Sequence, residues 1–373
     1  MRRDDGNSGN FVWQYAATRL LNPATHVIQP LLFLQHMSQQ QDVQLNTVDT
    51  LVVSTANVLM LEKDGIFAHV LTWYQHVAAT LRVPTVVIGM GVQADFGALS
   101  PTDVQTRQLY PHQKAFLQEL HQWQAAPATG VRGNATATIC RNSGETHCWP
   151  VGCPTLFFSR ALNLGKTLAQ KWRAVQAKVQ RGEKLNLVLT MPAFNPHVAD
   201  PLQAKHRDVM GKYLSRLDKT SKSSFWIKQM SFDDANLHVW EQQYNFTADW
   251  RQYDNVDAWK HDIIAHNTDL VISTRIHGGM MGLASETPTI VIATDFRILE
   301  LVEAMKIPHL TMDDVHDKGA LKKVANVLKF ARFQDFDAFE QNRRLRLQQW
   351  KDILATGNLE LDPTMQRILD APL

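Results

Sequence analysis

Short apolar runs alternate with longer amphipathic stretches along most of this chain. The apolar runs predict buried strands, and they lie at 48–54, 84–89, 185–190, 225–230, 270–273 and 289–293. The longer stretches between them predict helices. Alternating strands and helices favour parallel sheets covered by helices, because parallel strands need a crossover connection. We therefore predict an α/β fold with two doubly wound, Rossmann-like domains that face each other across a cleft.

The spacing of these elements divides the chain into three parts joined by a polar, basic connector. We expect an N-terminal Rossmann-like domain at 1–160, the connector at 159–184, a C-terminal Rossmann-like domain at 184–330 and C-terminal helices at 331–373. The pattern also predicts one helix over 103–123 and another over 336–354. The arginines of the latter helix, Arg343, Arg344 and Arg346, predict that it lies on the surface.

One predicted β-α-β unit, residues 269–295, carries the strongest candidate chemistry. Arg275 and His277 belong to a predicted turn at the carboxyl end of its first strand, where open α/β sheets bind ligands. A helix that begins with Gly278 and Gly279 offers free N–H groups to an anion. An arginine at a strand end is also often a surface ion pair, and a lone histidine is often a structural residue. The segment alone therefore leaves both interpretations open.

A glycine-rich segment near the start, GNSGN at 6–10, precedes a helix predicted over 11–21. Such a loop usually follows a strand in nucleotide-binding domains, and no strand precedes it here. Asn7, Gly9 and Asn10 either approach an anionic or sugar ligand or form a plain turn before the helix.

Two further glycine-containing segments follow predicted strands of the first half. GMGVQADFG comes directly after the strand at 84–89 and contributes Gln93 and Asp95 as polar candidates. GVRGNATA places Arg132 between a short strand and the expected start of a helix. Both segments therefore bring polar side chains to the carboxyl ends of strands.

Composition excludes several classes of function. The net charge is +2, which gives no indication of a nucleic-acid partner, and no apolar run is long enough to span a membrane. No apolar segment follows an N-terminal basic cluster, so we expect no signal peptide. The three cysteines, Cys140, Cys148 and Cys153, are too few and too irregular for a disulfide framework and lack zinc spacing. We expect free thiols and a cytoplasmic location, while a luminal one stays open if an N-terminal segment is missing.

Five segments, taken in order, resemble the polysaccharide pyruvyl transferases. They are GNSGNFVWQYA, GMGVQ, GVRGNATA, VGCPTLFF and STRIHGGMMGLASETPTIVIATD, and the resemblance covers about residues 6–310. These enzymes of polysaccharide biosynthesis move the enolpyruvyl group of phosphoenolpyruvate onto two sugar hydroxyls, which forms a pyruvate ketal and releases phosphate. The resemblance implies a GT-B-like pair of domains. It also implies phosphoenolpyruvate as co-substrate with no resident cofactor, and a lipid-linked or polymeric glycan acceptor.

The resemblance also implies roles for particular residues. The family's RxHG motif matches Arg275 and His277, and its arginine after a first-domain strand matches Arg132. The family often has an aromatic residue, an aspartate and a lysine after the next strand. This chain has Asp295 and Arg297 there, with its aromatic residue after the aspartate instead of before it.

The chemistry of the transfer suits these residue types. We expect Arg132 and Arg275 from opposite domains to clamp the carboxylate and phosphate of phosphoenolpyruvate, with N–H donors added by the start of the helix at Gly278. His277 is our choice for moving protons. No metal is demanded, since arginines carry the required positive charge. Candidates for the acceptor side are Asn7, Asn10, Gln93 and Asp95, of which Asp95 is either a base or a solvated turn residue.

Two other functions remain open at this stage. A glycosyltransferase that uses a nucleotide sugar has the same expected architecture. A binding protein that keeps the cleft without turnover is the third hypothesis.

Overall fold

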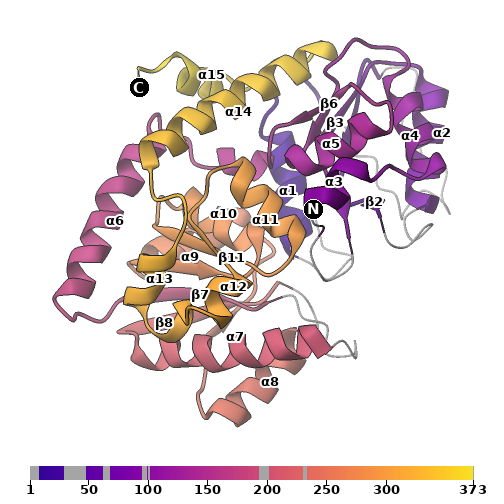
Figure 1. The fold of residues 1–373 in the computed structure, drawn as a ribbon. Coiled ribbons are helices and arrows are strands. Elements are labelled where there is room, and N and C mark those ends of the chain that lie inside the picture. Colours follow the sequence, from indigo (N-terminus) through magenta and orange to yellow (C-terminus); the bar gives the residue numbers. More distant parts are fainter. Residues whose placement is uncertain are drawn as a thin grey trace.

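Two parallel β-sheets form the framework of the protein (Figure 1). The computed structural model describes residues 8–28, 48–61, 68–94, 99, 101–192, 201–229 and 233–372. The four-stranded sheet contains, in spatial order, β1 Leu51–Ser54, β3 Thr85–Met90, β5 Thr129–Val131 and β6 Cys148–Pro150. The six-stranded sheet contains β12 His309–Thr311, β11 Thr289–Ala293, β10 Leu270–Ser273, β7 Asn186–Thr190, β8 Ser223–Ile227 and β9 Trp250–Arg251. A short parallel pair, β2 Leu59–Met60 and β4 Val92–Gln93, stands apart.

Helices make most of the connections between the strands, and they also precede the first strand and follow the last one. In the first half they are α1 Ser8–Thr18, α2 Ala68–Leu81, α3 Pro101–Thr106, α4 Pro111–His121, α5 Asn134–Asn142, η2 Pro154–Phe157 and α6 Leu164–Gln180. In the second half they are α7 Pro201–Thr220, α8 Asp233–Tyr244, α9 Val256–Ala265, α10 Ile276–Ala284, α11 Phe296–Ala304, α12 Met312–His316, η3 Ala320–Lys322, α13 Val324–Phe330, α14 Phe336–Thr356 and α15 Pro363–Asp370. All strand pairings within the two large sheets are parallel. The prediction of a Rossmann-like α/β fold with parallel sheets is therefore confirmed.

The predicted helix over 103–123 is two helices, α3 and α4. Pro111 is the first residue of α4, and Tyr110 before it is extended. A proline has no N–H to continue the preceding helix, and it disfavours helical geometry in the residue before it. The side-chain amide of Asn142 donates to the carbonyls of Val104, Gln105 and Arg107, which satisfies acceptors at the end of α3.

Two expectations from composition agree with the structure. Cys140, Cys148 and Cys153 are free and buried. Within the described residues, the helices are too short or too polar to cross a membrane.

Helix α14 joins the two halves. Figure 1 shows it running across the top of the molecule, from α6 to the four-stranded sheet. Its Arg343 is fully buried, donates to the carbonyls of Ala161 and Ser159, and forms an ion pair with Glu340 at 3.0 Å. The helix has the exposed face expected of a surface helix, as at Leu345, but the expectation that Arg343 marks that face is wrong, because this arginine donates to backbone carbonyls that the helix covers.

The far end of α14 packs on the four-stranded sheet through Trp350. This side chain is fully buried, and a Cβ added to Gly130 in β5 would lie 2.4 Å from its ring. Only a residue without a side chain allows the ring to approach the strand this closely.

We predict that Gly130→Ala lowers the free energy of unfolding by about 1–3 kcal/mol through overpacking. Chemical denaturation of the single variants and of Gly130→Ala with Trp350→Leu measures the effect. The double variant should lose less than the sum of the two single losses, because the smaller Leu makes room for the methyl group. Strictly additive losses would contradict the packing role of Gly130.

Candidate functional site

The candidate site is built on the connection between β10 and α10. All four residues of β10 are buried, and Arg275 is the extended residue that precedes the helix. Ser273 holds this connection, since its hydroxyl donates to the carbonyl of Arg275 at 2.6 Å. His277, which we predicted as part of a turn, is instead the second residue of α10.

The glycines of α10 allow the helix to pack closely on the sheet. A Cβ on Gly278 would lie 2.6 Å from Cγ2 of Thr190, and one on Gly279 would lie 2.5 Å from Cγ2 of Val291. The N–H of Gly279 donates to the carbonyl of Arg275 within the helix, so the expectation that this group is free for an anion is wrong. Gly278 is the third residue of the helix, and the N–H groups of the first three helical residues have no carbonyl partner within the helix.

Arg275 is held in place on one side of its guanidinium group. Nε donates to the carbonyl of Met191 at 2.7 Å, and Nη2 donates to the carbonyl of Pro192 at 3.3 Å. Nη2 also forms an ion pair at 2.5 Å with the fully buried Asp233, in the first turn of α8. Nη1 has no hydrogen-bond partner among the described residues, so this nitrogen remains for a ligand.

Arg132 has a similar arrangement at the end of β5. Its Nε donates to the carbonyl of Gly89 at 3.1 Å, and its Nη1 donates to Oδ1 of Asn57 at 2.5 Å. Gly91 makes room for the side chain, because a Cβ there would lie 2.7 Å from Cδ of Arg132. Within the described part of the chain, Nη2 of Arg132 makes no hydrogen bond.

Electrostatic effects show that the basic groups of both sheets converge. Burial lowers the pKa of Arg132, and the charge of Arg297 lowers it further. Burial and then the charge of Arg297 also lower the pKa of Arg275, although Asp233 opposes this effect. Arg297 of the six-stranded sheet therefore lies near Arg275 of the same sheet and near Arg132 of the four-stranded sheet.

His277 is buried and lies near Arg132. It is 8% exposed, and its Nε2 atom is buried without a hydrogen-bond partner among the described residues. Burial and then the charge of Arg132 lower the pKa of His277 to about 3. The imidazole is therefore neutral near pH 7, and a bound anion would raise its pKa by supplying the opposite charge.

The pair Asp295 and Arg297 lies at the start of α11. Asp295 accepts the N–H of Ile298 at 3.1 Å and pairs with Arg297 at 2.7 Å. Nη1 of Arg297 also donates at 3.2 Å to the side-chain oxygen of Gln93, in β4. Gln93, which we expected on the acceptor side, therefore contacts a cation of the other half.

Glu300 makes a second connection between α11 and the first half. Its buried carboxyl group accepts the N–H of Thr136 at 2.7 Å and the hydroxyl of Thr136 at 3.0 Å. Burial raises the pKa of Glu300 above its ordinary value. A Cβ on Gly133 would lie 2.4 Å from Cγ of Glu300, so the carboxyl group reaches the start of α5 only because Gly133 has no side chain.

Four residues that hold these groups were not predicted from the sequence. They are Asn57, Asp233, Glu300 and Thr190, and the hydroxyl of Thr190 accepts the N–H of Thr274 at 2.8 Å. Each is one polar residue in an otherwise ordinary segment, so neither motif nor periodicity singles it out. The spacing of Asp233 from Arg275 along the chain gives no signal of their pairing.

The remaining candidates belong to segments near α1 and β4. Asn7 and Asp95 lie outside the described residues. Gly9 and Asn10 belong to helix α1, so the prediction of a loop there is wrong for these two positions. Helix α1 lies beside α10, and its Val12 shares an apolar cluster with Met281, so α1 covers the helix that carries His277 (Figure 1).

Two cavities in the described part of the structure do not coincide with these residues. One of about 440 Å³ lies between α6 and the start of α14, and one of about 220 Å³ lies near the ends of α6 and α7. Neither is lined by Arg132, Arg275 or His277. Within the described residues, no group of three or more His, Cys, Asp and Glu side chains is placed to hold a metal ion.

Comparison with known proteins assigns no family to the chain. No protein-family model matches it, and no curated protein matches it. The function therefore has to be inferred from the residues of the site.

We predict that His277 makes the stability of the protein dependent on pH. An unfolded histidine binds a proton below its ordinary pKa of 6.5, whereas folded His277 stays neutral down to about pH 3. The unfolded state therefore binds more protons in this window, so stability falls as the pH falls. At pH 5 the loss is about 2 kcal/mol relative to pH 7.

Denaturation of wild type and His277→Gln at both pH values measures this difference. The variant should lose about 2 kcal/mol less on acidification, because glutamine does not titrate. Equal losses would mean that His277 is not held neutral by its surroundings.

We predict that Glu300→Ala lowers the free energy of unfolding by about 1–3 kcal/mol, because the buried N–H of Thr136 loses its acceptor. Glu303→Ala, an exposed position on the same helix, is the control and should change stability by less than about 0.5 kcal/mol. Hydrogen exchange at the start of α5 should also accelerate in Glu300→Ala alone. A change of equal size in the two variants would remove the connecting role of Glu300.

Proposed function

We propose that the protein is a pyruvyl transferase that moves the enolpyruvyl group of phosphoenolpyruvate onto two hydroxyls of a sugar or glycan. The proximity of Arg297 to both Arg132 and Arg275, and of Arg132 to the neutral His277, carries this proposal. Phosphoenolpyruvate has two anionic groups, a carboxylate and a phosphate, and guanidinium groups bind both kinds well. We further propose that the two sheets belong to two domains in a GT-B-like arrangement, with the site between them.

Two arginines and the start of α10 supply the hydrogen-bond donors for phosphoenolpyruvate in this proposal. Arg275 and Arg132 each have one terminal nitrogen without a partner among the described residues, while their other donors fix the side chains. Preorganised donors of this kind bind an anion with little loss of side-chain entropy. The N–H groups at the start of α10 add further donors for phosphate.

The reaction needs protons to move in both directions. The methylene carbon of phosphoenolpyruvate gains one proton and becomes a methyl group. The two sugar oxygens bond to the central carbon, the bond from that carbon to the phosphate oxygen breaks, and two hydroxyl protons are released. One of them balances the proton on the methyl group, and the other leaves with phosphate.

His277 is the group we assign to this proton transfer. A bound phosphoenolpyruvate places negative charge beside the imidazole, which raises its pKa toward neutrality. The protonated ring then donates to the methylene carbon, and the neutral ring accepts a hydroxyl proton in the next step. His277 would therefore carry a proton only in the complex.

We predict that phosphoenolpyruvate raises the thermal midpoint of the protein, because it binds the folded state. Uridine or guanosine diphosphate sugars should raise it little. A shift with a nucleotide sugar alone would favour a glycosyltransferase, and binding of phosphoenolpyruvate without transfer to any glycan would favour a binding protein.

Substitution of His277 tests its role as the acid–base group. His277→Gln should reduce phosphate release with a glycan acceptor by a factor on the order of 10²–10⁴, the usual contribution of an acid–base group. His261→Gln, at an exposed position on α9, is the control and should keep full activity. Unchanged turnover in His277→Gln would remove the acid–base role.

A further inference from the structure

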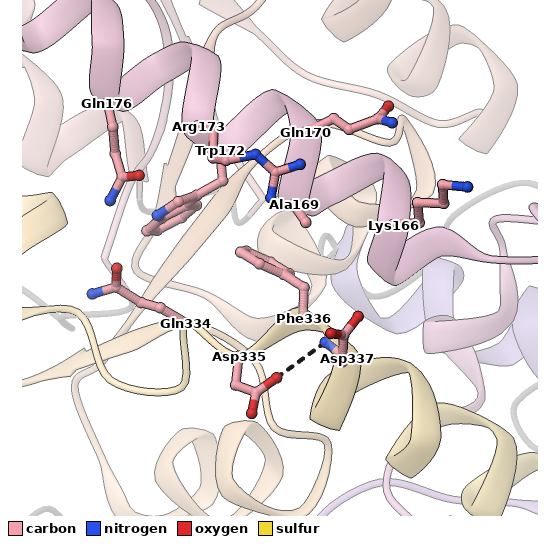
Figure 2. Close-up of a pocket in the computed structure, with 10 residues that line it drawn as sticks. All are labelled: Lys166, Ala169, Gln170, Trp172, Arg173, Gln176, Gln334, Asp335, Phe336 and Asp337. Atoms are coloured by element: carbon pink, nitrogen blue, oxygen red, sulfur yellow. Dashed lines mark hydrogen bonds between the residues drawn. The ribbon is translucent and has the colours of Figure 1, made fainter. Parts of the chain in front are cut away.

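The larger cavity lies on the side of the molecule formed by α6 and the start of α14. Figure 2 shows its lining, with the side chains of α6 on one wall and residues 334–337 on the other. Its volume of about 440 Å³ falls within the range of small-molecule sites. Nothing in the proposed pyruvyl transfer uses this cavity.

A buried donor without a partner lies in this lining. Trp172 is 3% exposed, and its indole Nε1 has no hydrogen-bond partner among the described residues. The ring packs against Phe336 at a centroid distance of 5.5 Å. Figure 2 shows the nitrogen edge of Trp172 on the side where Gln176 and Gln334 lie. A ligand atom that reaches this edge must be a hydrogen-bond acceptor.

The opposite wall offers acceptors. The amide nitrogen of Gln334 donates to the carbonyls of Leu328 and Ala331, so its oxygen is left for another donor. One carboxylate oxygen of Asp335 accepts the N–H groups at the start of α14, and the carboxylate of Asp337 makes no hydrogen bond among the described residues. These oxygens require a ligand that donates hydrogen bonds.

The charges of the lining balance. Lys166 and Arg173 line the α6 wall, and Asp335 and Asp337 line the other. A bound anion would be repelled by the carboxylates, and a bound cation would be repelled by the basic groups. The amide groups of Gln170 and Gln176 both donate and accept. An apolar ligand would remove water from all these groups without replacing its hydrogen bonds.

We propose that this cavity binds a neutral sugar unit. A sugar hydroxyl both donates and accepts, so separate hydroxyls of one sugar unit can accept from the basic groups of the α6 wall and donate to the carboxylates of the other wall. The sugar would contact the protein at a site separate from Arg132, Arg275 and His277. This inference does not depend on pyruvyl transfer, and each can fail without the other.

Nuclear magnetic resonance of the indole N–H groups tests the site. The chain has ten tryptophans, and the signal of Trp172 is the one absent from Trp172→Phe. Methyl glycosides of glucose, galactose and mannose are titrated into the full-length protein labelled with ¹⁵N-tryptophan. We expect at least one of them to shift the Trp172 signal in a saturable manner.

Variants show whether the shift arises in the cavity. Asp337→Ala should weaken the binding of that glycoside about tenfold, the effect of losing a hydrogen bond to a charged group. Lys171→Ala, an exposed α6 position outside the lining, should leave it unchanged. A Trp172 signal that responds to no glycoside would overturn the proposal. So would a signal that responds only to glycine or inorganic phosphate, or binding that is equal in both variants.

Discussion

The buried carboxyl group of Glu300 is the contact on which the geometry of the candidate site depends. It connects α11, which follows β11 of the six-stranded sheet, to the first turn of α5, which follows β5 of the four-stranded sheet. Arg132 lies immediately before that turn, so the contact holds it in place relative to the second half. Arg297, also in α11, makes a further connection to the first half, because it donates a hydrogen bond to Gln93 in β4. Hydrogen bonds to charged groups contribute about 1.5–3 kcal/mol each, enough to fix the relative position of these segments.

The second constraint is the accumulation of positive charge in a buried place. Buried cations are costly unless carboxylates or carbonyls pair with them. Arg275 is paired with Asp233, Arg297 is paired with Asp295, and Arg132 donates to a carbonyl and an amide oxygen. Burial, and then the positive charge of Arg132, keeps His277 neutral. A dianionic ligand would compensate the accumulated positive charge, which is why we connect the site to phosphoenolpyruvate.

How far the sequence predicts this arrangement depends on the range of each interaction. Strands β10 and β11 were predicted with the right bounds, because each is a compact apolar run and the helix between them is rich in small residues. The start of α10 was placed two residues too late, because the glycines suggested a helix start although they serve packing. The break at Pro111 could have been read from the sequence.

The partners of the site residues could not be predicted in the same way. Glu300 and Thr136 are 164 residues apart, and Arg132 and Asn57 are 75 apart. Such pairs follow from the three-dimensional packing of two sheets, and a single sequence contains no local signal for them. The burial of Arg343 has the same origin, since the carbonyls it satisfies belong to another part of the chain.

The central claim is that the arginines and His277 form one receptor for a dianion. Calorimetric titration of phosphoenolpyruvate near pH 7, in buffers of different ionisation enthalpy, counts the protons bound with the ligand. We predict that wild type takes up more protons than His277→Gln and that its affinity falls more steeply as the pH rises. Equal proton uptake in both proteins, or no binding of phosphoenolpyruvate at all, would contradict it.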